Sequence, residues 1–105
     1  MEPSQADLGR FAEPELLILV SLASGPKHGY AMMQDIKALC GVRLGPGTLY
    51  GALARLERRG LIEPLPAEDR RRPYRITSVG IISLRARIES MCSVVSAGLE
   101  RLAAT

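Results

Sequence analysis

Residues 45–62 read GPGTLYGALARLERRGLI, and this stretch decides the fold. Its leucines recur at Leu49, Leu53 and Leu56, which is the spacing of an amphipathic helix. We expect the helix to begin within residues 45–48 and to end at Gly60, because a glycine commonly follows the last helical turn. The spacing then changes, and residues 61–65 and 73–76 predict two short strands of a β-hairpin with a polar, basic tip.

Two helices are predicted before this stretch. The first begins at Pro14, ends at Gly25-Pro26 and is apolar almost all round, which is typical of a central core helix. The second spans about residues 29–39 and is closed by Cys40-Gly41. Its inward side is expected to carry Met32, Met33, Ile36 and Leu39. A brief extended piece is expected at residues 42–44.

A long final helix is predicted from Thr77 or Ser78, either of which can cap it, to about Ala103. Its apolar residues follow a spacing close to heptads, and three short helices cannot cover so long a stripe. We therefore expect a second subunit to cover it, the alternative being a helix folded back on its own domain. The expected dimer-interface residues are Ile81, Leu84, Ile88, Met91, Val95, Leu99 and Leu102.

The predicted fold class is mainly α with a small β-hairpin: a winged helix-turn-helix followed by a long C-terminal dimerisation helix. The expected domains are a flexible N-terminal arm at residues 1–12, a winged-helix DNA-binding domain at 13–77 and the dimerisation helix at 78–105. A chain of 105 residues is long enough for one such domain.

Positive charge is concentrated in the middle of the chain. The formal net charge is +3, yet residues 43–75 alone hold eight Arg and four acidic residues, a net +4. Arginine suits planar contacts with phosphate and with guanine edges, so this segment favours a nucleic-acid partner. The alternative is a solvated basic face without a partner.

Enzyme chemistry is not predicted. The single histidine, His28, is expected to position the turn before the second helix, since no nucleophile motif accompanies it. Cys40 and Cys92 lack metal-ligand spacing, and no phosphate-binding loop is present, so we expect no catalytic site, no metal and no cofactor. The apolar run at residues 16–23 is too short to span a membrane, and no targeting segment is visible, which predicts a cytoplasmic protein.

In a winged helix-turn-helix the recognition helix enters the major groove, and the hairpin, or wing, contacts the flanking backbone. Thr48 could instead cap its helix, Tyr50 could half-bury its ring against the second helix, and Arg70 could pair with Glu68 or Asp69. Arg55 points away from the leucines, which leaves solvent, phosphate or bases as its partners. The expected DNA-binding residues are Thr48, Tyr50, Gly51, Arg55, Arg58, Arg59, Arg70, Arg71 and Arg72.

These motifs together resemble the PadR family of bacterial transcriptional regulators. The resemblance rests on the 17–25 segment, His28-Gly29-Tyr30, Gly47-Thr48-Leu49-Tyr50, Gly60-Leu61-Ile62 and Tyr74-Arg75-Ile76-Thr77 with Gly80 three residues on. It implies a cytoplasmic homodimeric repressor whose last helix forms the dimer interface, and a small-molecule effector that relieves repression. Family members commonly have Pro where this chain has Gly51. The absence of Trp argues against stacking of a planar aromatic ligand.

We therefore expect a dimer that reads a roughly palindromic operator in double-stranded DNA, with half-sites about one helical turn apart. The alternative is a winged-helix module that binds protein and not DNA.

Overall fold

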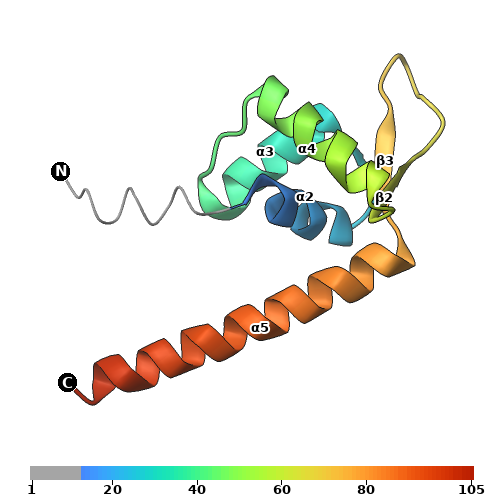
Figure 1. Cartoon of the computed structure of the whole chain (residues 1–105). Helices are drawn as coiled ribbons and strands as arrows, with labels where there is room; N and C mark the ends of the chain where they lie inside the picture. The colour runs from blue at the N-terminus through green and yellow to red at the C-terminus, as the bar shows by residue number, and fades with distance from the viewer. Residues whose placement is uncertain (1–12) are drawn as a thin grey trace.

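The computed structural model describes residues 13–105 as a helical head, a small sheet and one long helix (Figure 1). The arm predicted at residues 1–12 lies outside the described residues. In chain order the elements are α2 (Pro14–Ala23), β1 (Lys27–His28), α3 (Gly29–Cys40), α4 (Pro46–Arg58), β2 (Ile62–Pro64), β3 (Pro73–Ile76) and α5 (Ser78–Ala103). The predicted mainly helical winged-helix fold is confirmed.

α2 is the central helix, as its apolar sequence predicts. It begins with Pro14 at its first position and packs against α3, α4 and α5. Burial of a large aliphatic side chain contributes about 1.5–3 kcal/mol, so this shared core is the main stabilising feature of the head. The buried apolar residues are Leu17, Ile18, Leu19, Leu22, Met32, Ile36, Leu49, Ala52, Leu53, Leu56, Leu61, Ile62 and Leu84.

α3 ends at Cys40 and is closed, as predicted, by Gly41, whose φ of +77° is the left-handed conformation that glycine adopts readily. Met32 and Ile36 are fully buried. The prediction for Leu39 is wrong, since its side chain is exposed. Leu39 lies in the last turn of α3, beyond the part of the helix that α2 and α4 cover.

The sheet has three strands in the order β1-β3-β2, all antiparallel. The predicted hairpin is present, and its prolines stand at strand ends, with Pro64 closing β2 and Pro73 opening β3. β1 was not predicted, because two residues are too few to show a strand period. The extended piece expected at residues 42–44 forms no strand.

The start of α5 is fixed to the end of α4. Gly60 has a φ of +73°, and its carbonyl accepts a hydrogen bond from the Thr77 hydroxyl at 2.7 Å. The same hydroxyl accepts from the Gly80 N–H at 3.0 Å, so Thr77 caps α5 as predicted. A Cβ on Gly80 would collide with the Leu61 carbonyl oxygen. α5 therefore leaves the head at a geometry set by the α4–β2 turn.

Beyond its first turns, α5 runs out of the head (Figure 1). Leu84 was predicted to lie in the dimer interface, but it is 7% exposed and belongs to the core of its own domain. Exposure then rises along the helix, from 40% at Ile88 to 72% at Leu102. The alternative of a helix folded back on its own domain holds for the first part of α5, which packs on α2 and pairs Arg87 with Glu13. From Ile88 onward the apolar stripe is at least 40% exposed within residues 13–105.

Candidate nucleic-acid interface

The first turns of α4 present small and polar residues to solvent. Thr48 is exposed, and the N-cap of the helix is Gly45. The alternative in which Thr48 caps the helix is therefore wrong. Gly51 is partly exposed, and a Cβ there would meet only the Arg55 side chain, at 3.5 Å. The backbone of α4 can therefore come close to a partner at Gly51.

Tyr50 connects α4 to the start of α3. Its side chain is 53% exposed, yet its hydroxyl lies so close to Gly29 that a Cβ built on Gly29 would stand 2.6 Å from it. The bare Gly29 thus makes room for this phenol. The expected packing of the Tyr50 ring on the second predicted helix is present, while much of the side chain stays accessible, and its contact with DNA stays a prediction.

Two arginines of α4 already have partners within the chain. Arg55 Nε donates to Glu15 Oε2 at 3.0 Å, and Arg59 Nη1 donates to Glu15 Oε1 at 3.0 Å. The expectation that Arg55 meets only solvent, phosphate or bases is therefore wrong, because the first turn of α2 brings a carboxylate beside it. The sequence holds no local signal for this pairing, because Glu15 lies 40 positions before Arg55. Arg58, on the same helix, is exposed.

The tip of the wing, the hairpin of β2, β3 and the loop between them, is a tight turn. The backbones of Glu68 and Arg71 exchange hydrogen bonds of 2.6 and 2.8 Å around Asp69 and Arg70. Asp69 and Arg70 have φ values of +47° and +65°, the pattern of a type I′ hairpin turn. That turn prefers glycine at its second position, so Arg70 is held in a conformation that costs about 1 kcal/mol. No ion pair joins Arg70 to Glu68 or Asp69 in the described structure.

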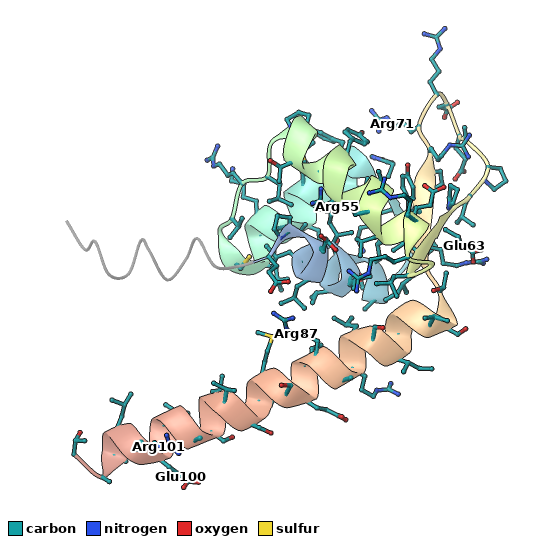
Figure 2. The ribbon with its side chains drawn as sticks, viewed as in Figure 1. Arg55, Glu63, Arg71, Arg87, Glu100 and Arg101 are labelled. Atoms are coloured by element: carbon teal, nitrogen blue, oxygen red, sulfur yellow. The ribbon has the colours of Figure 1, made fainter. Side chains whose placement is uncertain are left out.

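Arg71, which projects from the hairpin loop (Figure 2), and Arg72 after it have different neighbours. Arg71 points back towards α3, where its Nη1 lies 3.3 Å from His28 Nε2, whereas Arg72 donates to the Leu65 carbonyl at 3.1 Å. Arg75 pairs with Glu63 across the two strands, with a shortest N–O distance of 2.6 Å. Arg70, Arg71 and Arg72 all line a cavity of about 360 Å³ that Tyr50 also lines, so the wing tip and α4 share one surface. We call the exposed part of α4 (Thr48, Tyr50, Gly51) and these three wing arginines the reading face.

Tyr74 lies behind this surface in β3. Burial raises the pKa of its phenol above the ordinary value, and the nearby Glu57 carboxylate acts in the same direction. Tyr74 therefore keeps its proton at neutral pH and remains a hydrogen-bond donor beside the wing arginines.

His28 occupies the turn before α3, as predicted, and it also faces the wing, which was not predicted. It is the last residue of β1 and the N-cap of α3, where Nδ1 accepts from the Ala31 N–H at 3.3 Å. The pairing of β1 with β3, with His28 opposite Pro73, brings it beside the wing. No local sequence signal reveals a two-residue strand.

Residues 13–105 contain no group of three or more His, Cys, Asp or Glu side chains placed to hold a metal ion. No helix in this range is long and apolar enough to cross a membrane. Both cysteines are free and exposed.

Comparison with known proteins gives a family match. The transcriptional regulator PadR-like family matches residues 18–86. An uncharacterized 37.1 kDa protein in transposon TN4556 of Streptomyces fradiae is 46% identical over 82 residues, which cover 78% of this chain and 24% of that protein. The transcriptional activator GvpE2 of Halobacterium salinarum is 31% identical over 88 residues, covering 84% of this chain and 42% of that protein. This chain therefore spans less than half the length of these two relatives.

A solved structure of a transcriptional regulator from Clostridium thermocellum superposes with a TM-score of 0.72 at 31% identity. The superposition covers 79% of this chain and 86% of that one.

Proposed function

This chain belongs to the PadR-like family of transcriptional regulators, and we propose that it binds double-stranded DNA in the cytoplasm as a homodimeric repressor. The observation that carries this proposal is the reading face. Tyr50 of α4 and the three wing arginines line one cavity of this face, and Thr48 and Gly51 lie beside Tyr50 on the accessible start of α4. A major groove about 12 Å wide admits an α-helix, and arginines beside that helix would meet the flanking phosphates.

The small residues of α4 determine how closely this helix could approach DNA. Gly51 and Thr48 leave the outer backbone of α4 accessible, so the helix can approach base edges closely. Phosphate contacts from the wing would fix its position, and the side chains around Thr48 and Gly51 would choose the sequence.

The dimer is supported by the uncovered stripe of α5. Six of the seven predicted interface residues are at least 40% exposed in the single chain, an apolar surface that soluble proteins usually cover with a partner. Pairing two α5 helices would relate two reading faces by a two-fold axis. A roughly palindromic operator with half-sites about one helical turn apart is the matching DNA.

Repression would follow if the bound dimer blocks polymerase, and a small-molecule effector would relieve it by altering the dimer. A cavity of about 570 Å³ between Ala23 of α2 and Ile81, Leu84 and Ile88 of α5 is the place we propose for such a ligand. Its position would couple ligand binding to the angle at which α5 leaves the head. A reporter gene behind the bound promoter, compared with and without this protein, tests the direction of regulation.

Binding to DNA from upstream of the protein's own gene, measured at several salt concentrations, tests DNA recognition. Each phosphate contact steepens the plot of log affinity against log salt by about one. The double variant Arg71→Ala/Arg72→Ala should therefore bind more weakly, with a slope reduced by about two.

Arg75→Ala is the matched control. It removes a guanidinium from the same hairpin, but one that Glu63 already neutralises. The control should bind like the wild type. No binding by the wild type at low salt, or equal binding by the double variant, would contradict the proposal.

A further inference from the structure

The two ring nitrogens of His28 have distinct neighbours. Nδ1 accepts the Ala31 N–H at the start of α3, and a nitrogen that accepts a hydrogen bond carries no proton. In the neutral ring the proton is therefore on Nε2, so the α3 cap makes Nε2 a donor.

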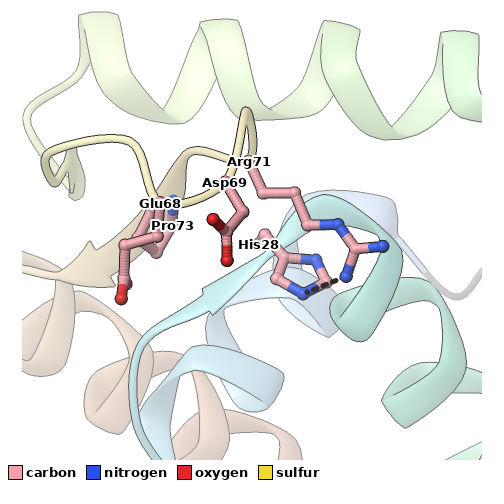
Figure 3. A pocket seen from close by; sticks show the side chains of 5 residues that line it. All are labelled: His28, Glu68, Asp69, Arg71 and Pro73. Atoms are coloured by element: carbon pink, nitrogen blue, oxygen red, sulfur yellow. Dashed lines mark hydrogen bonds between the residues drawn. The ribbon is translucent and has the colours of Figure 1, made fainter.

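That donor faces another donor. Arg71 Nη1 lies 3.3 Å from His28 Nε2, and a guanidinium has no acceptor atom (Figure 3). The two groups cannot satisfy one another, and a protonated ring would only add a second positive charge. A negatively charged oxygen between them would accept from both.

Within residues 13–105, no side chain provides this oxygen. Glu68 and Asp69 line a neighbouring cavity with His28 and Arg71, and Figure 3 shows the Asp69 carboxylate on that side of the ring. Yet no described ion pair joins either carboxylate to Arg71. His28 and Arg71 also line the cavity that Tyr50, Arg70 and Arg72 line.

Tyr50 brings a third polar group to this cavity, with its hydroxyl over Gly29, the residue after His28. Imidazole, guanidinium and phenol thus come from β1, the wing and α4, three elements far apart in the sequence. Their shared preference is for an anionic oxygen, and their cavity lies on the reading face, between α4 and the wing tip.

We propose that His28, Arg71 and Tyr50 bind one phosphodiester group of the DNA backbone, with His28 Nε2 and Arg71 donating to its non-bridging oxygens. This inference rests on the proposed function. It gives His28 a direct role in binding, and the bound phosphate would tie the wing to α3.

His28→Asn separates this role from capping. Asparagine is among the preferred N-cap residues, so it can accept the Ala31 N–H, but it is too short to place a donor near Arg71. We expect thermal unfolding to be nearly unchanged and DNA affinity to fall about tenfold, the loss typical of a hydrogen bond to a charged group. Combined with Arg71→Ala, the losses should be smaller than additive, because both residues serve one phosphate.

Duplexes with one neutral methylphosphonate at successive positions locate the phosphate. At one position in each half-site, the methylphosphonate should weaken DNA binding by the wild type. The same methylphosphonate should cause little further loss of affinity in His28→Asn, which already lacks the contact with that phosphate. Because the Arg71 side chain is exposed, Arg71→Ala should show the same insensitivity without disturbing the fold, so the test stands even if His28→Asn unfolds.

The two proposals fail differently. If the wild type binds no duplex, the proposed function is wrong and this inference falls with it. If the wild type binds and His28→Asn, while folded, binds equally tightly, only the phosphate site is wrong. A wild type that responds to inorganic phosphate at His28 yet loses affinity at no methylphosphonate position would also overturn the assignment to DNA.

Discussion

The arginines of α4 and the wing differ mainly in whether an acidic neighbour already neutralises them. Arg55 and Arg59 share Glu15, and Arg75 pairs with Glu63, whereas Arg71 faces His28. Exposed ion pairs are weak, typically below about 1 kcal/mol, so a DNA phosphate could compete for Arg55 and Arg59. Glu15 would then tune affinity without contacting DNA.

Glu15→Gln tests that competition. Loss of the carboxylate frees two guanidinium groups and removes a negative charge near the proposed DNA, so affinity should rise about threefold. The free energy of unfolding should fall by less than about 1 kcal/mol, as thermal denaturation would measure. Glu63→Gln, on the outer side of the wing, should leave affinity unchanged. A weaker-binding Glu15→Gln would mean that Glu15 orients the arginines instead.

Arg70 holds a left-handed backbone conformation at the wing tip, and Arg70→Gly separates conformation from contact. Glycine adopts φ of +65° without strain, so the thermal midpoint should stay level or rise. DNA affinity should fall, because the tip loses a positive charge. Calorimetry and fluorescence anisotropy measure the two effects. A lower midpoint, or undiminished affinity, would show that Arg70 serves the fold alone.

The sequence predicted which side chains of α4 face outward, but it did not predict which residues pair with one another. The apolar spacing of α4 identifies Thr48, Tyr50 and Gly51 as outward, and the structure agrees. The partner of Arg55 lies 40 positions away, at Glu15, and only the packing of α2 on α4 makes them neighbours. For the same reason the sequence does not place His28 beside Arg71.

Among the elements, the junction of α4, β2 and α5 sets the direction in which α5 leaves the head. Thr77 bonds to the Gly60 carbonyl and caps α5, while Gly80 lies against Leu61. Long elements with strong periodicity were predicted well: α5 begins after Thr77 and ends at Ala103, as expected. β1 was missed, since its two residues form a strand only by pairing with β3.

Gly80→Ala should strain this junction. Its new Cβ would overlap the Leu61 carbonyl oxygen and lie 2.8 Å from the Ile76 side chain. Overpacking of this kind costs about 1–3 kcal/mol, measurable by denaturant unfolding. Gly51→Ala is the matched control, because its Cβ meets only an ordinary contact and a helical alanine is favoured by up to about 1 kcal/mol. Equal stability of the two variants would rule out a close-packed junction.

At the scale of the whole molecule, residues 13–105 form an elongated body of 55 × 33 × 20 Å, because α5 extends beyond the head. The apolar stripe from Ile88 to Leu102 is at least 40% exposed within residues 13–105. Two chains related by a two-fold axis would cover it and would double the reading face. A net charge of +3 per chain would then become a larger positive charge facing the DNA.

Ile88→Asp should break the proposed dimer. A buried, unpaired carboxylate would disfavour association strongly, whereas the head has its own core and should stay folded. Sedimentation should find a dimeric wild type and a monomeric variant. Ile82→Asp, a matched change at an exposed α5 position outside the predicted stripe, should remain dimeric. A wild type that is already monomeric would contradict the paired-site arrangement.

Selection of bound duplexes from a randomised DNA library, followed by measurement of the mass of the complex, tests the central claim most directly. If the protein is a dimeric winged-helix regulator, the selected sequences should contain an inverted repeat with half-sites about one helical turn apart, and two chains should bind each duplex. Selection without an enriched sequence, or of a single unrepeated site that one chain occupies, would contradict it.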